Sequence, residues 1–261
     1  MMRHPLSSLT AVLLISALVL AAAPPRAFGR DRPGDFDFYL LALSVAPSFC
    51  ELTGRRKHKA QCEDTSDADY RATPLTVHGL WPNKRDRSNQ EQPQACSRQP
   101  LELPDDLVAA LQRVMPGIAD GLERYEWNKH GVCSGLSPEA YFRRVVALAE
   151  AANQTIGTAM RERGFFGRPM AVTDLLAAVK AKNPDLADAL VVNCQFSRQQ
   201  RGGARSRAYV DEVRILIAKE LPTSPGSDGW PASFVRRSDV GYSANSGCPR
   251  GVGFLPAGFE D

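Results

Sequence analysis

The stretch FDFYLLALSVA, residues 36–46, consists almost entirely of aromatic and aliphatic residues, with one acid and one serine. This composition predicts a buried β-strand. Three more stretches predict strands: residues 75–81 (LTVHGLW), residues 190–196 and residues 208–219. Strands are therefore predicted toward both ends of the chain.

Helical patterns fill the space between these strands. Residues 105–115 have apolar side chains at helical spacing, and residues 121–130 predict a second helix that ends before a glycine. Ser137, followed by proline and glutamate, predicts the start of a third helix. Residues 50–70 are polar and charged, and predict a long loop. Strands outside and helices between them, without a βαβ rhythm, predict an α+β fold.

The first 29 residues have the features of a secretory signal peptide. A basic start is followed by the apolar run of residues 9–23 and then by small residues suited to cleavage. An uncleaved membrane anchor is the alternative, but the run is shorter than the roughly 20 residues that a span needs. We expect a soluble, exported protein without membrane association, either secreted or periplasmic.

The charge of the chain is nearly balanced. It has 32 Lys and Arg against 29 Asp and Glu, and residues 1–29 hold two of the basic residues and no acid. Such a protein has no strong overall field to attract nucleic acid, so polyanion binding would need local patches. Three basic stretches are candidates, although each has the composition of an ordinary solvated loop: residues 55–59, 84–87 and 198–207.

Six cysteines follow the predicted signal peptide. An even number in an exported chain predicts three disulfides, but spacing alone does not choose the pairing. The absence of a CxxC pair weakens a zinc or redox interpretation.

The most reactive stretch is EWNKHGVC, residues 126–133. Glu126, Lys129 and His130 are spaced i, i+3 and i+4, so they lie on one helix face. They could be an ordinary surface trio. However, the end of a helix raises the pKa of a histidine such as His130, and histidines are scarce, with four in the chain. His78 and His130 each precede a glycine and lie near a tryptophan, which favours a paired-histidine site.

Cys133 offers two competing interpretations. The stretch GVCSG, residues 131–135, resembles a nucleophile elbow with cysteine in place of serine, but such an elbow follows a strand, and here a helix precedes it. A zinc site from His78, His130 and Cys133 lacks a convincing ligand spacing. Export favours a disulfide at Cys133 over both.

Two histidines, a lysine and a glutamate suit one reaction in particular. Cleavage of RNA by its own 2′-hydroxyl needs a base for the 2′-proton and an acid for the leaving 5′-oxygen. Imidazoles can serve as either, and a lysine can stabilise the charge on the phosphate. The nucleophile belongs to the substrate, so the reaction requires no metal and no protein nucleophile.

At this point a resemblance to a known family is clear. TVHGLWP, residues 76–82, and EWNKHGVC, residues 126–133, resemble the two active-site segments of the ribonuclease T2 family. Residues 36–50 resemble the first core strand of the family and the loop after it, and residues 210–221 resemble a late strand. The resemblance thus spans most of the chain after residue 29.

The resemblance implies a single domain, residues 30–261, with a central antiparallel β-sheet flanked by helices. It implies an endoribonuclease that cleaves single-stranded RNA through 2′,3′-cyclic phosphates, which are hydrolysed to 3′-phosphates, without a cofactor or metal. We expect a monomer. The family pattern also suggests a disulfide pairing: Cys50–Cys62, Cys96–Cys133 and Cys194–Cys248.

Four residues map onto the catalytic positions of the family. His78 and His130 form the acid–base pair, with His130 as the base and His78 as the acid in the first step. Glu126 and Lys129 support the phosphate and the transition state.

Three more residues map onto substrate-binding positions. Trp81 corresponds to an aromatic that stacks on a base. Asn83 stands where the family often has an aspartate that contacts a base edge, so base preference is expected to differ. Tyr125 replaces a histidine that helps to hold phosphate, which predicts weaker substrate binding. That replacement also supports an alternative, a secreted RNA-binding or inhibitor protein on the same fold with reduced catalysis.

Overall fold

The computed structural model describes most of the chain. The described residues are 31–53, 59–63, 66–88, 91–197, 207–220 and 230–259. The predicted signal peptide, residues 1–29, and most of the basic stretches at 55–59 and 198–207 lie outside them. None of the helices in the described residues is long and apolar enough to cross a bilayer.

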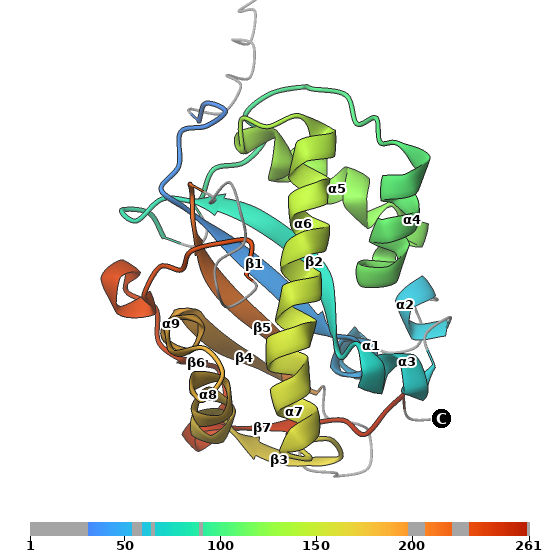
Figure 1. Cartoon of the computed structure of the whole chain (residues 1–261), viewed down its shortest axis with the longest axis vertical. Coiled ribbons are helices and arrows are strands. Elements are labelled where there is room, and N and C mark those ends of the chain that lie inside the picture. Colours follow the sequence, from blue (N-terminus) through green and yellow to red (C-terminus); the bar gives the residue numbers. More distant parts are fainter. Residues whose placement is uncertain are drawn as a thin grey trace, which may run out of the picture.

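A seven-stranded sheet runs through the described part of the chain (Figure 1). Its main path follows the order β2-β1-β5-β4-β6, while β3 pairs with β7 and β7 also touches β5. The strands are β1 (Phe38–Val45), β2 (Leu75–Asn83), β3 (Arg168–Ala171), β4 (Leu190–Phe196), β5 (Ala208–Ala218), β6 (Asn245–Ser246) and β7 (Val252–Leu255). The pairs β1–β2, β1–β5 and β4–β5 are antiparallel, so the central antiparallel sheet is confirmed; β6 adds a short parallel pair at the edge.

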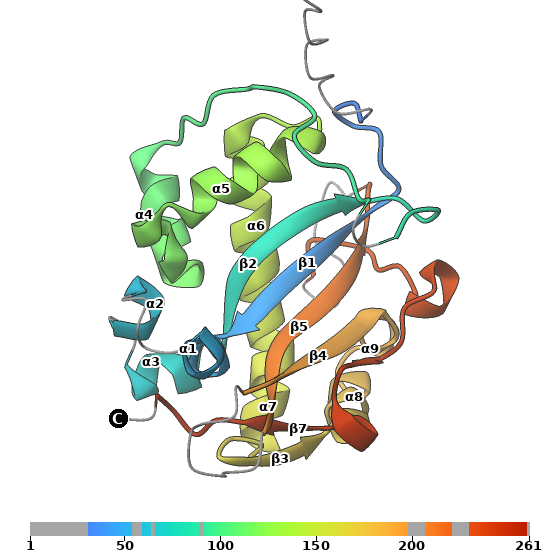
Figure 2. The same cartoon turned by 180° about the vertical axis from the view of Figure 1, so that it is seen from behind.

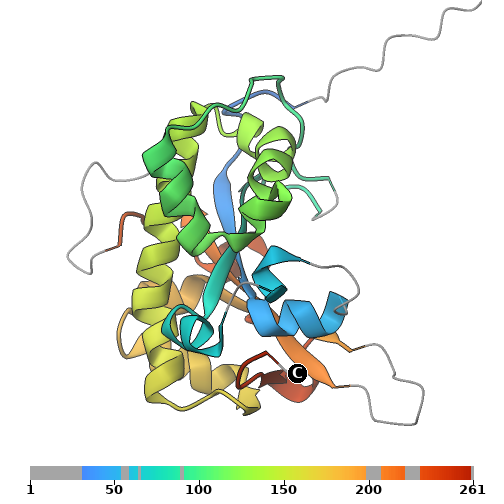
Figure 3. The same cartoon turned by 90° about the vertical axis from the view of Figure 1, so that its right-hand side faces the viewer.

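Helices cover the sheet unequally. They are α1 (Ala46–Thr53), α2 (Ala60–Glu63), α3 (Asp67–Ala72), α4 (Asp105–Val114), α5 (Leu122–Lys129), α6 (Pro138–Ala152), α7 (Thr158–Glu162), α8 (Val172–Lys180) and α9 (Pro184–Ala189). The long helix α6 crosses one face of the sheet, continued by α7 (Figure 1). Seen from behind, none of the described helices crosses the other face of the sheet, which we call the open face; α1 and α2 border it at one end and α4 and α5 at one side (Figures 2 and 3).

The predicted first strand lies inside the sheet, between β2 and β5. All eight residues of β1 are buried, because β2 and β5 flank it and side chains cover both of its faces. This position explains why residues 36–46 are continuously apolar and do not alternate, since a strand buried on both faces has no solvent side. The strand prediction is confirmed, with ends shortened to Phe38 and Val45.

The predicted loop at residues 50–70 is wrong in part, because α1, α2 and α3 occupy much of it. A capping box starts α3: the Ser66 hydroxyl accepts from the Asp69 amide, and Asp69 accepts from the Ser66 amide. Tyr70 on this helix is buried and donates to the carbonyl of Pro256 near the other end of the chain. A local cap and one distant contact thus stabilise α3. The polar composition of the segment does not indicate this helix.

All three disulfides have the predicted pairing: Cys50–Cys62, Cys96–Cys133 and Cys194–Cys248. The second joins the loop after β2 to the 3-10 turn that follows α5, and the third joins β4 to the segment after β6.

Candidate active site

Two β-bulges on the open face of the sheet shape the site. Between β1 and β2, Gly79 pairs with Ala42 and Val77 with Leu43, so His78 is an extra residue on its strand. Between β4 and β5 the register skips Asp211 in the same way. A bulge bends its strand and redirects a side chain, and bulges are common beside active sites. Here the two bulges bring His78 of β2 together with β5.

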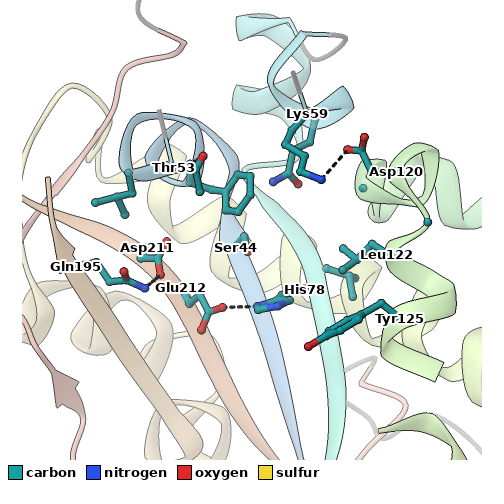
Figure 4. Close-up of a pocket in the computed structure, with 16 residues that line it drawn as sticks. Ser44, Thr53, Lys59, His78, Asp120, Leu122, Tyr125, Gln195, Asp211 and Glu212 are labelled. Carbon is teal, nitrogen blue, oxygen red and sulfur yellow. Dashed lines mark hydrogen bonds and ion pairs between the residues drawn. The ribbon is translucent and has the colours of Figure 1, made fainter. Parts of the chain in front are cut away.

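His78 makes a short hydrogen bond across the sheet. Its Nδ1 lies 2.6 Å from Oε1 of Glu212 on β5, as Figure 4 shows. Glu212 is buried, and its other oxygen accepts from Arg214. Burial lowers the pKa of His78, but the hydrogen bond and charge of Glu212 outweigh burial, with help from Glu126 and Asp211, so the net pKa is raised. The ring of His78 is therefore held in place and favoured in its charged form.

Glu126, predicted as phosphate support, is almost fully buried, with 1% of its surface exposed. Its Oε2 accepts from the indole N–H of Trp81 at 2.7 Å, and its Oε1 lies 3.8 Å from Nε2 of His78. Burial raises the pKa of this carboxyl despite the opposing charge of His78. Glu126 thus fixes Trp81 and lies beside the first histidine.

The second histidine has the opposite electrostatic character. His130 caps the C-terminal end of α5, and its Nδ1 is buried without a hydrogen-bond partner among the described residues. A charged imidazole has two donors to satisfy, so this environment favours the neutral ring. Burial, reinforced by the charges of Lys129 and His78, lowers its pKa to about 3. The expected rise from the helix dipole is therefore wrong, because desolvation is the larger effect.

Trp81 lies between the two histidines. Its ring is 5.1 Å from the His78 ring in an edge-on arrangement, and 5.3 Å from the His130 ring at an interplanar angle of 35°. The tryptophan therefore separates the two imidazole rings and also lines the site. Asn83, two residues on, is buried and donates from Nδ2 to the Trp81 carbonyl at 2.8 Å.

Lys129 and Tyr125 form the solvent edge of the site on α5. The lysine Nζ donates to the tyrosine hydroxyl at 3.1 Å, and 55% of the tyrosine surface is exposed. The tyrosine that replaces the family histidine is thus positioned by the lysine one helical turn later. It points toward the cavity beside His78 (Figure 4).

Two cavities meet at His78 and Tyr125, which line both. The Ser44 cavity, about 490 Å³, contains Glu212, Asp211 and Ser44 (Figure 4). The Trp81 cavity, about 420 Å³, is lined by all seven predicted catalytic and substrate-binding residues: His78, Trp81, Asn83, Tyr125, Glu126, Lys129 and His130. The fold thus brings together residues from two distant segments of the sequence.

Sequence reasoning missed Glu212, Asp211 and Arg214. They lie on β5, more than 130 residues after His78, and no local motif connects the two strands. A signal was present, because two adjacent acids interrupt a strand of aliphatic residues. Acidic residues are rarely buried unless they are paired, so acids within a buried strand are candidates for a functional role.

Cys133 is bonded to Cys96 and is 1% exposed. A disulfide sulfur is neither a thiolate nucleophile nor a zinc ligand. Both alternative interpretations of Cys133, the nucleophile and the zinc ligand, are therefore wrong. Among the described residues, no group of three or more His, Cys, Asp or Glu side chains is placed to hold a metal ion.

The arrangement can carry out acid–base chemistry. One imidazole has a raised pKa and the other a lowered pKa, and both line the Trp81 cavity. Pairs of titratable groups whose environments separate their pKa values are typical of a general acid and a general base.

Comparisons with known proteins identify the family of the chain. The sequence profile of the Ribonuclease T2 family matches residues 36–222. "Ribonuclease I" of Escherichia coli (strain K12) is 30% identical over 82% of this chain and 87% of its own length, and "Ribonuclease" of Aeromonas hydrophila is 30% identical over 80% and 84%. The fold is similar to that of ribonuclease MC1 from bitter gourd seeds, with a TM-score of 0.55 at 19% identity, covering 84% of this chain and all of that one. These similarities show that the chain belongs to the ribonuclease T2 family and is an endoribonuclease of that family.

Proposed function

We propose that this endoribonuclease cleaves single-stranded RNA by transphosphorylation to 2′,3′-cyclic phosphates, followed by hydrolysis to 3′-phosphates. The observation that carries the proposal is the pairing of two histidines with opposite pKa shifts in one cleft. No metal or cofactor takes part in the proposed steps.

In the first step His130, neutral because of its lowered pKa, takes the proton of the 2′-hydroxyl. The 2′-oxygen attacks the phosphorus, and the bond from phosphorus to the 5′-oxygen breaks. His78, protonated because of its raised pKa, gives its proton to the leaving 5′-oxygen. In the second step water attacks the cyclic phosphate, and the histidines exchange roles.

Lys129 and Glu126 support this reaction differently. The lysine ammonium at the mouth of the cavity stabilises the charge that develops on the phosphate oxygens. Glu126 is buried beside His78 and fixes Trp81, so it maintains the geometry and the charge of the acid.

The two cavities suggest the direction in which RNA crosses the site. His130 lines the Trp81 cavity and not the Ser44 cavity, whereas His78 lines both. The base must reach the 2′-hydroxyl, so the nucleotide on the 5′ side occupies the Trp81 cavity. The leaving nucleotide then extends past His78 into the Ser44 cavity. Placing successive bases in separate cavities requires unstacked RNA, which favours single strands.

Substrate binding is proposed to involve three residues of the Trp81 cavity. Trp81 stacks on the base, Asn83 contacts its edge, and the Tyr125 hydroxyl binds a phosphate oxygen without adding charge. Cleavage of all sixteen dinucleotides by wild type and Asn83→Asp tests the base contact. An unchanged order of preference in the variant would remove Asn83 from recognition.

A fluorogenic RNA assay in EDTA, with the two histidine variants His78→Ala and His130→Ala, tests the mechanism. Each substitution should lower kcat/KM by roughly 10²- to 10⁴-fold, the usual contribution of a general acid or base. Asn128→Ala is the control and should retain activity, because Asn128 is exposed on the same helix and lines neither cavity. Circular dichroism checks that each variant is folded. Full activity in both variants would place the chemistry elsewhere, and an inert wild type would favour an RNA-binding protein.

We also propose that residues 1–29 direct export and are removed, leaving residues 30–261 as a monomeric ribonuclease domain in the periplasm or outside the cell. The three disulfides support export, since such bonds persist in oxidising compartments. Mass spectrometry and sedimentation of the exported protein test this: an intact N-terminus or a dimeric mass would contradict it.

A further inference from the structure

A third cavity of about 350 Å³ lies next to the Trp81 cavity on the open face of the sheet. Its walls are the loop after β2, the strands β5 and β4, and the segment that leads into β6. We call it the Ser243 cavity, after a serine in its wall. Arg214 and Tyr242 line both this cavity and the Trp81 cavity, so the two are neighbours.

The charge of the Ser243 cavity differs from that of the other two. The only charged side chains among its lining residues are Arg87 and Arg214, and its other polar side chains are Ser88, Tyr242, Ser243, Asn245 and Ser246. Carboxyl groups line both other cavities: Glu126 in the Trp81 cavity, and Asp120, Asp211 and Glu212 in the Ser44 cavity. Guanidinium, hydroxyl and amide donors without a carboxylate favour an anionic ligand.

Both arginines are held in place by contacts with carboxylates. Arg214 contacts one oxygen of Glu212 through Nε and Nη2, each at 2.7 Å. Arg87 contacts Asp31 and the Glu91 carbonyl through Nη1. A guanidinium has five donor N–H groups, so these contacts leave donors on each arginine for a ligand. An anchored guanidinium loses little further freedom when it binds phosphate.

We propose that the Ser243 cavity binds the phosphate on the 5′ side of the nucleotide in the Trp81 cavity. This inference rests on the proposed function, which places the 5′ nucleotide next to His130. The Ser243 cavity lies beside the Trp81 cavity through Arg214 and Tyr242, and neither of these residues lines the Ser44 cavity. The next anionic group along the RNA in that direction is the 5′-phosphate of the same nucleotide. The enzyme thus binds at least one phosphate group beyond the single phosphate of a dinucleotide.

Dinucleotides phosphorylated at opposite ends test the proposal. For the dinucleotide NpN that is cleaved best, kcat/KM is compared among NpN, pNpN and NpNp. The last two carry the same charge, so general attraction cancels between them. We expect pNpN to exceed NpN by about tenfold, the effect of one charge-assisted hydrogen bond, and to exceed NpNp as well. Equal values for pNpN and NpNp, or a gain for NpNp alone, would overturn the proposal.

The ratio of pNpN to NpN is then measured in Arg87→Gln and in Arg85→Gln. Arg85 is an exposed arginine two residues away in the same loop, and it lines none of the three cavities. The ratio should fall to near one in Arg87→Gln and stay unchanged in Arg85→Gln. Because each ratio compares two substrates on the same variant, a general loss of activity divides out. An unchanged ratio in Arg87→Gln would overturn the site.

The test separates this inference from the proposed function. If wild type cleaves NpN to a cyclic phosphate but shows no gain for pNpN, the chemistry stands and the Ser243 cavity is not a phosphate site. If wild type cleaves none of the three substrates, the proposed function fails, and the phosphate site fails with it.

Discussion

At His78 the influences that raise the pKa of the imidazole outweigh burial, whereas at His130 burial and nearby positive charge outweigh the one hydrogen bond that raises it, to the backbone of Pro93. Burial disfavours the charged form of both rings. Only His78 has a carboxylate at hydrogen-bond distance from its ring, so only its pKa is raised. His130 has a lysine and the first histidine nearby, which lower its pKa further. The different surroundings of two identical side chains thus suit one to be the acid and the other the base.

For the proposed roles of His130 as base and His78 as acid, these shifts predict the pH profile. The base His130 must be neutral, so activity should rise with pH through its pKa of about 3. The acid His78 must be protonated, so activity should fall as pH rises through its pKa, which lies above the usual 6.5. kcat/KM measured from pH 2 to 9 should therefore show a broad bell with its plateau on the acid side of neutral. A flat profile, or one centred in alkali, would contradict the assignment.

Glu212→Gln tests whether this glutamate positions and charges the acid. The substitution removes the carboxylate that raises the pKa of His78 and leaves the burial that lowers it. The alkaline limb of the pH profile should move to lower pH, and the acid limb should stay in place. The loss of rate should remain below the roughly 10²- to 10⁴-fold contribution of the acid itself.

Asp211→Asn is the comparison for Glu212→Gln. Asp211 acts on His78 only through charge, as the smallest of its influences, so the alkaline limb should move less. NMR titration of the His78 ring gives the same answer without kinetics. A purely structural role for Glu212 would lower the rate equally at every pH and leave both limbs in place.

At the scale of elements, β2 and α5 meet so closely that Gly79 leaves no space for a side chain. A Cβ at this position would collide with the Trp81 indole nitrogen and the Glu126 carboxylate. A glycine is therefore required between His78 and Leu80 so that β2 can pack this closely against α5. Gly79 is next to the bulged residue His78, so a shift of the strand at Gly79 would also move the His78 side chain.

Gly79→Ala should separate Trp81 from Glu126 and shift His78. We expect a stability cost of about 1–3 kcal/mol, typical of overpacking, and a fall of roughly 10²-fold in kcat/KM from misplaced groups. Thermal unfolding and steady-state assays measure the two effects. Gly164→Ala is the control, because Gly164 has a positive φ and open space around it. It should cost stability and leave kcat/KM unchanged; equal activity losses in both variants would contradict the spacing argument.

Elements were predictable where local rules decide them. The Ser137 cap, the strand at 75–81 and the helix at 121–130 all form where spacing and capping indicate, within a few residues. The prediction of a loop at 50–70 failed because its helices are too short to show an apolar period, and they depend on the Ser66 cap and on tertiary packing.

At the scale of the whole molecule, α6 covers one face of the sheet and leaves the other open, and the three cavities lie along the open face. The strand order β2-β1-β5 places His78, the proposed acid, within hydrogen-bond distance of Glu212 on a late strand. The Cys96–Cys133 disulfide then connects the loop after β2 to the end of α5, the helix that His130 caps.

Removal of this disulfide with Cys96→Ser and Cys133→Ser should lower stability by about 2–5 kcal/mol. It should also reduce kcat/KM at temperatures far below unfolding, because the segment around His130 loses its attachment to the other wall of the site. Chemical denaturation and assays at 20 °C measure the two effects. The Cys194–Cys248 pair is the control and should affect stability much more than kcat/KM. Full activity without Cys96–Cys133 would show that packing alone holds the segment.

The resemblance to the family was enough to suggest the disulfide pairing. The sequence alone identified most of the strands and helices outside residues 50–70 and the two histidine segments. Each depends on short-range information: apolar period, capping residues and contiguous motifs. Three features emerge only in the folded molecule: Glu212 raises the pKa of His78, burial lowers the pKa of His130, and the three cavities adjoin along one face. Those features depend on which strands become neighbours and on how much water remains around a side chain, and both are set by long-range packing.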